Sequence, residues 1–212
     1  GNNSIAVGGN VLASGISAVA FGVNTTASGD YSTVMGYRPT ASGYASTAMG
    51  GGSVASGDYS TAMGYFATAS EGGSLAMGSL TTASGSNSAA MGYLTTASGG
   101  NSTAMGYQTT ASGSNSTAMG SGTSASGYDS TAMGYTTTAS DYASLVTGQY
   151  NLSGYNVTSA ATFNTANTAF VIGNGSADNN RSDAFKVLFN GTTTIAGNVT
   201  APSFIGELNG TI

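Results

Sequence analysis

Few side chains in this 212-residue chain could carry out chemistry. It contains no histidine and no cysteine. The sequence therefore predicts no Ser-His-Asp or Cys-His catalytic group, and no imidazole or thiolate metal site within one chain. The eight carboxylates are scattered, and we interpret them, including Asp30 and Asp58 at one turn position, as solvated turn residues. We expect no enzyme activity, no metal and no cofactor.

Charge and hydropathy exclude two further classes of function. The net charge is −5, and Arg38, Arg181 and Lys186 are the only cations. Such an acidic chain lacks the basic surface that nucleic-acid binding requires, so we expect no nucleic-acid partner. No apolar run approaches about 18 residues, so we expect no membrane insertion by this segment. Because cysteine is absent, the chain contains no disulfide and must be stabilised by other contacts.

Tyrosine provides the candidate ligand surface, because its ring offers apolar area with a polar tip. The tyrosines recur at fixed spacing, so they would line one edge of a folded repeat. Tyrosine also commonly packs at β-turn edges, and that structural role stays open. The series beside one turn comprises Tyr37, Tyr65, Tyr93, Tyr107 and Tyr135, and the series beside the opposite turn comprises Tyr31, Tyr44, Tyr59, Tyr128 and Tyr142.

These side chains belong to a repeat with a period of fourteen residues. A strict period of this kind is typical of a repeat architecture. A second glycine follows seven residues after most of the first ones, with Glu71 and Asp141 as exceptions. The eleven first glycines are Gly8, Gly22, Gly36, Gly50, Gly64, Gly78, Gly92, Gly106, Gly120, Gly134 and Gly148.

The repeat predicts two short strands and two tight turns. Each copy is rich in Gly, Ser and Thr, which are poor helix formers, and it has no apolar heptad seam. Ser-Thr-Ala-Met-Gly is the first predicted strand and Thr-Thr-Ala-Ser-Gly the second, with the glycines at turn positions that need a positive φ. One repeat is then one coil of a parallel β-solenoid. Ten steps between eleven coils span roughly 48 Å.

Alternation along the first strand assigns its side chains to two faces. Ser102 and Ala104 share one face, which suits a narrow lumen, whereas Thr103 and Met105 share the other. A continuous methionine stripe facing outward favours a partner surface. In the alternative arrangement methionine fills the lumen and alanine packs outside. The column comprises Met35, Met49, Met63, Met77, Met91, Met105, Met119 and Met133.

The repeats at 101–106 and 115–120, both Asn-Ser-Thr-Ala-Met-Gly, resemble the head repeat of trimeric autotransporter adhesins, the YadA-like head. The resemblance covers residues 1 to about 148. It implies a left-handed parallel β-roll, three chains packed side by side, and a role as a surface adhesin. The methionine column would then be the trimer-packing column. Thr and Met stand where the family more often has Val and Ile.

The period is lost after Gly148, which divides the chain into a head of eleven repeats (1–148) and a β-rich neck, stalk or fibre connector (149–212). Residues 181–208 are similar to segments of virus and phage tail fibres. The chain starts in the middle of a coil, so we expect it to be a piece of a longer fibre.

The sequence thus predicts the non-enzymatic head of a homotrimeric extracellular fibre at a cell or virion surface. Its expected partners are host or matrix proteins, glycans or other cells. A receptor-binding or decoration fibre of a virus or phage is the alternative, and an ice-binding solenoid is a minor one. Ice binding requires two threonine columns side by side, whereas Thr109 and Thr110 are adjacent, so only one of them points outward.

Overall fold

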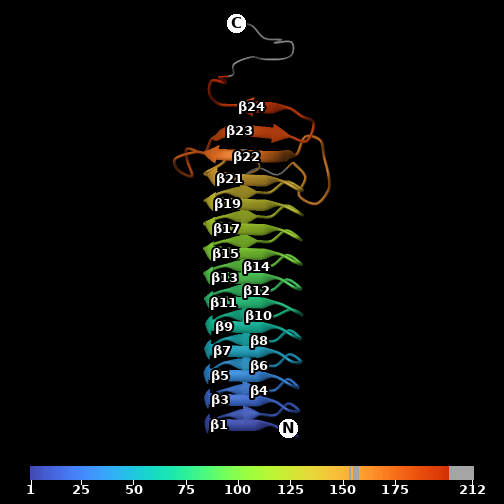
Figure 1. Ribbon diagram of the computed structural model, residues 1–212, viewed down its shortest axis with the longest axis vertical. Helices are drawn as coiled ribbons and strands as arrows, with labels where there is room; N and C mark the ends of the chain where they lie inside the picture. The colour runs from blue at the N-terminus through green and yellow to red at the C-terminus, as the bar shows by residue number, and fades with distance from the viewer. Residues whose placement is uncertain (153, 155–157, 201–212) are drawn as a thin grey trace.

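The computed structural model describes residues 1–152, 154 and 158–200. Within these ranges the chain is all-β and contains no helix. Figure 1 shows a single tall column of stacked coils that starts at β1 and climbs through β21 to β24. The column has one sheet of fourteen strands and another of ten. The predicted parallel β-solenoid is confirmed.

Each coil contributes a long strand and a short strand. In the coil around Met105 these are β15 (Thr103–Tyr107) and β16 (Thr110–Ala111), so the first starts one residue later than predicted and the second has two residues. The other long strands of the roll are β1 (Ile5–Gly9), β3 (Val19–Val23), β5 (Thr33–Tyr37), β7 (Thr47–Gly51), β9 (Thr61–Tyr65), β11 (Leu75–Ser79), β13 (Ala89–Tyr93), β17 (Thr117–Ser121), β19 (Thr131–Tyr135) and β21 (Leu145–Gln149). The other short strands are β2 (Leu12–Ala13), β4 (Thr26–Ala27), β6 (Thr40–Ala41), β8 (Val54–Ala55), β10 (Thr68–Ala69), β12 (Thr82–Ala83), β14 (Thr96–Ala97), β18 (Ser124–Ala125) and β20 (Thr138–Ala139).

The coils stack in parallel with a register of one full repeat. Met91 pairs with Met105, and Gly92 pairs with Gly106. Because every coil adds the same residue type at the same place, each repeat position becomes a column along the axis. Sequence periodicity is thereby converted directly into surface pattern.

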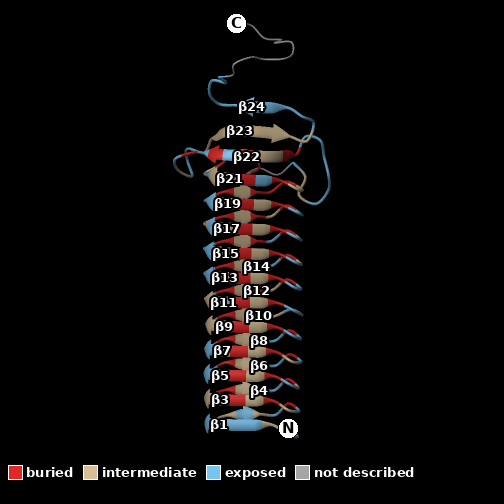
Figure 2. Ribbon diagram, in the orientation of Figure 1, coloured by how far each residue is buried: buried red, intermediate tan, exposed pale blue. Residues whose placement is uncertain are grey.

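The lumen is filled by small side chains, as predicted. Ala104 and Ala111 have no solvent exposure, and Ser102 and Thr109 are buried beside them. Figure 2 shows this buried stripe running through the middle of the coils from β3 upward, whereas the first coil, at β1, is exposed. Met105 points outward and is half-buried. The arrangement with methionine in the lumen is therefore wrong, because a fourteen-residue coil leaves room for little more than alanine or valine.

The repeat glycines serve two different purposes. Gly106 has φ +122°, and a Cβ on it would lie only 2.0 Å from the carbonyl oxygen of Gly120. Gly113 has no left-handed φ, although a Cβ there would lie 2.1 Å from the Gly127 carbonyl oxygen. The expectation that both glycines supply a positive φ is wrong for the second series. Close approach of the next coil favours glycine in the second series. Glu71 and Asp141 are the two exceptions at this position.

Side chains other than glycine make most of the left-handed turns. Gln108 (φ 51°) follows the long strand, and Asn115 (φ 56°) lies at the opposite turn. Asparagine tolerates this conformation better than most residues. These two positions turn the chain between strands, and they explain why the second strand is shorter than the sequence predicts.

The long sheet continues beyond the last regular repeat. β22 (Thr168–Asn174) pairs in parallel with β21, and Gly173 lies opposite Gly148. β23 (Asp183–Leu188) and β24 (Thr193–Ile195) then add in antiparallel orientation. Short strands in this region are thus confirmed. The fourteen-residue period ends near Gly148, but the sheet itself does not.

Candidate binding surface

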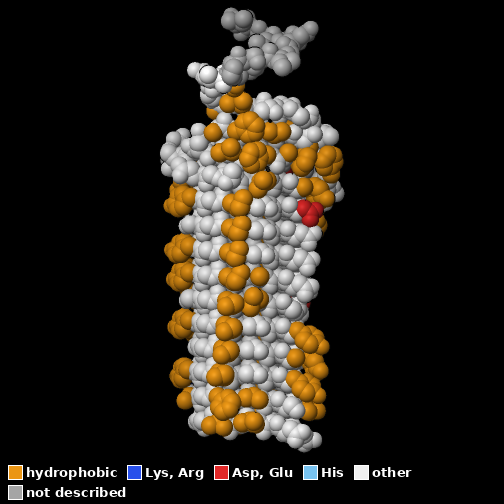
Figure 3. Space-filling view, in the orientation of Figure 1, with side chains coloured by type: hydrophobic (Ala, Val, Ile, Leu, Met, Phe, Trp, Pro, Cys, Tyr) orange, Lys and Arg blue, Asp and Glu red, His pale blue; other side chains and the backbone are white. Residues whose placement is uncertain are grey.

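The outer face of the long sheet presents three parallel columns. In β15 they are formed by Thr103, Met105 and Tyr107, because alternate residues of a strand share a face. Pairing in register repeats threonine and methionine from coil to coil, whereas the tyrosine position also holds Ser121 and Gly51. Figure 3 shows the result as a hydrophobic stripe along the column, with further hydrophobic side chains toward both edges.

The methionine stripe is the largest apolar feature of this face. Met35 is 42% exposed and Met77 is 37% exposed, while the methionines of the other described coils are half-buried. Phe21 and Val7 extend the stripe to the first coil. Full burial of such a side chain stabilises by about 1.5–3 kcal/mol, so a stripe of this length favours contact with another apolar surface.

The tyrosine column along the edge is interrupted rather than continuous. Tyr93 and Tyr107 lie in adjacent coils with their rings stacked at 5.5 Å. Gly51 separates Tyr37 from Tyr65, because all three share one register position. At the far end, a hydrogen bond with Tyr150 raises the pKa of Tyr135. The predicted surface residues Tyr37, Tyr65, Tyr93, Tyr107 and Tyr135 are all exposed.

The opposite edge carries a second aromatic ladder. Tyr44 packs edge-to-face against Tyr31 at 5.4 Å and against Tyr59 at 5.5 Å. Partial burial, with the nearby Tyr59, Tyr31 and Asp30, raises the pKa of Tyr44. The Tyr44 phenol therefore remains neutral at physiological pH.

The carboxylates of this edge connect coils. Asp30 Oδ1 accepts a hydrogen bond from the Ile16 amide at 2.7 Å, and Asp58 Oδ1 accepts one from the Tyr44 amide at 2.9 Å. Asp129 likewise accepts a hydrogen bond from the Asn115 side chain at 2.9 Å. These groups satisfy amide donors of the neighbouring coil and are not placed to act as an acid–base pair.

Asp141 is not a solvated turn residue, which corrects the sequence-based interpretation. Its side chain is buried, and the residue is 1% exposed. The carboxylate accepts amide hydrogen bonds from Thr158 at 2.6 Å, Ser159 at 3.3 Å and Thr168 at 2.9 Å. It occupies a repeat-glycine position at the point where the chain leaves the roll, so its oxygens satisfy the amides of the following segment.

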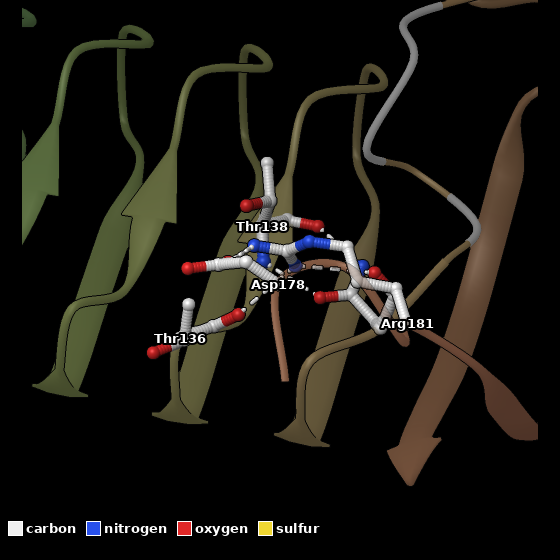
Figure 4. Close-up of polar contacts among 5 residues, drawn as sticks. Thr136, Thr138, Asp178 and Arg181 are labelled. Carbon is white, nitrogen blue, oxygen red and sulfur yellow. Dashed lines mark hydrogen bonds and ion pairs between the residues drawn. The ribbon is translucent and has the colours of Figure 1, made fainter. Parts of the chain in front are cut away.

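A polar cluster closes the last coil, and sequence reasoning did not identify it. The Asn151 amide accepts from the Thr138 N–H and donates to the Thr138 carbonyl, both at 2.8 Å. The Arg181 guanidinium donates to the Thr136 carbonyl at 3.2 Å and forms an ion pair with Asp178 at 2.6 Å (Figure 4). The higher content of aromatic and basic residues after Gly148 was the sequence signal that could have pointed to this cluster.

The described residues contain no group of three or more His, Cys, Asp or Glu side chains placed to hold a metal ion. Across the same residues, no helix is long and apolar enough to cross a membrane.

The fold and this surface together define a repeat protein of structural type, a parallel β-solenoid with an apolar stripe on one outer face. A family model described as the YadA head domain repeat, in two copies per match, matches residues 13–38, 41–67, 69–95, 97–123 and 125–151. These matches cover more than half of the chain, which therefore belongs to the YadA head family. Heads of this family are surface-exposed trimeric adhesins and not enzymes. No curated protein sequence matches the chain significantly.

Proposed function

We propose that this chain forms the homotrimeric, non-enzymatic head of an extracellular surface fibre and presents a binding surface to host or matrix proteins, glycans or other cells. The observation that carries the proposal is the outward methionine stripe, which runs along a roll of the YadA head family. The stripe is long, apolar and continuous, as an interface between identical columns requires.

Three copies would place their long sheets toward a common axis. Each methionine would then contact its equivalents in the two other chains, so the stripe would be buried along its full length. Residues 1–148 carry few charged side chains, and Arg38 is the only cation among them. Electrostatic repulsion between the three copies would therefore come from only a few acidic side chains. The tyrosine edges would flank the interface and stay available for ligands.

The trimer is tested by measuring mass in solution together with the double variant Met91→Asp/Met105→Asp. Three chains would bury six unpartnered charges, each costing several kcal/mol, so this variant should dissociate or unfold. Thr96→Asp/Thr110→Asp is the matched control, because it alters the outer face of the short sheet and should remain trimeric. A stable wild-type monomer at micromolar concentration would contradict the proposal.

The alternative of a virus or phage fibre shares the same architecture and differs in attachment. The sequence of the natural protein on either side of this chain separates the two. Strands of a membrane anchor would support the adhesin, and a self-cleaving chaperone or a capsid-attachment segment would support the virion fibre.

The side-chain geometry does not favour an ice-binding face. Thr109 is buried in the lumen and Thr110 points outward, so the short sheet carries one threonine column. On the long sheet, Met105 lies next to Thr103 in place of a second threonine. We expect no thermal hysteresis from the purified protein, and clear faceting of ice crystals would contradict the adhesive proposal.

A further inference from the structure

The interruption of the tyrosine column at Gly51 opens a cavity in the outer surface. The cavity has a volume of about 410 Å³ and is lined by Tyr37, Arg38, Gly51, Gly52, Tyr65 and Phe66. We call it the glycine gap. It is formed by three consecutive coils, in which Gly51 pairs with Tyr37 on one side and with Tyr65 on the other.

The spacing of the two walls suits a single ring. Tyr37 and Tyr65 are two strands apart, which is about 9.6 Å at the usual strand spacing. The second wall is reinforced by Phe66, whose ring lies 4.6 Å from that of Tyr65. Gly52 takes a left-handed φ of +66°, and a Cβ there would meet the Phe66 ring at 2.9 Å. Glycine at both positions thus lets the Tyr65 and Phe66 rings lie over the Gly51 and Gly52 backbone, and these rings form one wall of the gap.

Arg38 gives this aromatic gap a positive charge. It is the only basic side chain of residues 1–148. Its guanidinium carbon lies 5.5 Å from the centroid of the Tyr37 ring, and the side chain is exposed. Arg38 forms no ion pair with any described residue. Among the described residues, the one ion pair joins Arg181 to Asp178. An unpaired guanidinium in an acidic protein favours an anionic ligand.

We propose that the glycine gap binds an acidic sugar, a pyranose ring carrying a carboxylate, within a surface glycan. The apolar face of the ring would pack against Tyr37, Tyr65 and Phe66, and the carboxylate would pair with Arg38 in bidentate geometry. Tyrosine hydroxyls would bond to the sugar hydroxyls. This inference rests on the proposed function as an adhesive head and names the ligand class.

Two variants test the gap. Gly51→Tyr fills it with the residue that other coils carry at this position, and it should fold because Gly51 has no left-handed φ and its nearest neighbour is the Tyr65 ring at 3.3 Å. Arg38→Gln keeps a long polar side chain and removes the charge. Ser121→Tyr is the control, because it fills the same position between Tyr107 and Tyr135 in coils that do not contain Arg38.

Glucuronic acid and glucose are suitable probes, because they differ in the carboxylate. We expect the wild-type protein to bind glucuronic acid at least tenfold more tightly than glucose, measured by calorimetry or ligand-observed NMR. Arg38→Gln should abolish this preference, Gly51→Tyr should weaken glucuronic acid binding at least tenfold, and Ser121→Tyr should match the wild type. Equal affinity for both sugars, or an unchanged affinity in Gly51→Tyr, would overturn the inference.

Two further measurements separate this inference from the proposed function. Sodium acetate at the same concentration should not displace glucuronic acid, and full displacement would show that the carboxylate alone is bound, contrary to the inference. Adhesion of the protein to cells and to matrix protein is then measured directly. Adhesion without acidic-sugar binding would refute the sugar site and leave the adhesive head standing, whereas absence of adhesion to every surface would refute the adhesive head.

Discussion

At the scale of single residues, the first series of repeat glycines determines how closely two coils can approach. The backbone of Gly106 lies against the carbonyl of Gly120, and the same contact recurs from Gly8 to Gly148. All eleven copies keep glycine at this position. Glycine is favoured because the contact joins two main chains, and neither backbone can move away to make room for a Cβ.

Gly106→Ala should therefore be strongly destabilising. Its Cβ would meet the Gly120 carbonyl oxygen at 2.0 Å, and its φ of +122° is unfavourable for alanine. We expect a loss of about 3 kcal/mol or more, measured by chemical denaturation. Gly100→Ala is the control, because no heavy atom lies within 4 Å of its Cβ position and its φ is not left-handed. Equal stability of the two variants would contradict this interpretation of the repeat.

The hydroxyl groups of the lumen behave differently from the glycines. Among the described residues, the buried hydroxyls of Thr109 and Ser102 have no hydrogen-bond partner, and the same holds for several of their equivalents. Val11 and Ala67 occupy the Thr109 position in other coils, so the fold does not require a hydroxyl there.

Thr109→Val should leave stability unchanged or raise it by up to about 1 kcal/mol, because an isosteric side chain removes an unsatisfied polar atom. Thermal unfolding measured by circular dichroism provides the check. Thr110→Val changes the outward neighbour and should have an effect near zero. A loss of more than about 1 kcal/mol in Thr109→Val would indicate that the lumen hydroxyls are bonded in solution.

Residue-level chemistry was only partly predictable from the sequence. Alternation predicted that Met105 and Ala104 face opposite sides, and the narrow lumen of a fourteen-residue coil favoured alanine inside, but methionine in the lumen stayed an alternative until the structure placed Met105 outside. The left-handed φ of Gln108 was not predictable, because stacking of the neighbouring coils imposes it against the residue's own preference. The role of Asp141 was missed, because its partners Thr158 and Thr168 follow it by 17 and 27 residues.

At the scale of elements, the two sheets end in different ways. The long sheet is extended by β22, whereas the short sheet ends at β20 within the described part of the chain. Ser124 N donates to the Thr137 main-chain carbonyl at 2.8 Å, but Thr138 N donates to the Asn151 side chain. Asn151 thus replaces one strand with one amide group and covers an otherwise exposed edge.

Asn151→Ala should loosen the last coils without unfolding the roll. Thr138 would lose a partner for both its N–H and its carbonyl, at a local cost of about 2 kcal/mol. Hydrogen exchange of the Thr138 amide should accelerate by roughly tenfold or more, while amides near β9 stay protected. Asn2→Ala at the opposite end should leave this exchange unchanged, and an unaltered rate in Asn151→Ala would refute the capping role.

The element pattern of the roll was predictable because one short sequence is repeated eleven times, so each weak local signal recurs. The elements after Gly148 lack that reinforcement. The alternation of Phe185 and Val187 predicted a strand, and β23 confirms it. The parallel addition of β22 opposite β21 was not predictable, because the paired residues Gly148 and Gly173 are 25 positions apart in the sequence instead of fourteen.

At the scale of the whole molecule, the roll is close to one-dimensional. Each strand of the long sheet pairs only with the strand before it and the strand after it. Stability is then a sum of coil and interface contributions, and coils of similar sequence are interchangeable.

Deletion of residues 103–116 removes one complete coil and joins Ser102 to Thr117. We expect the variant to fold, with a column about 4.8 Å shorter by small-angle X-ray scattering. Deletion of residues 103–115 removes one residue fewer, so it shifts the register and should disrupt the coils on one side of the junction. Equal tolerance of the two deletions would contradict the strict register.

The direction of the inter-coil hydrogen bonds has a mechanical consequence. These bonds point along the column, so a pulling force on the column ends loads them directly, one coil interface after another. Each coil that detaches releases fourteen residues, or on the order of 48 Å of extended chain, from a rise of about 4.8 Å. Each released coil therefore becomes roughly tenfold longer than its rise in the column, so a head built this way extends stepwise under load and absorbs mechanical work before its attachment is lost.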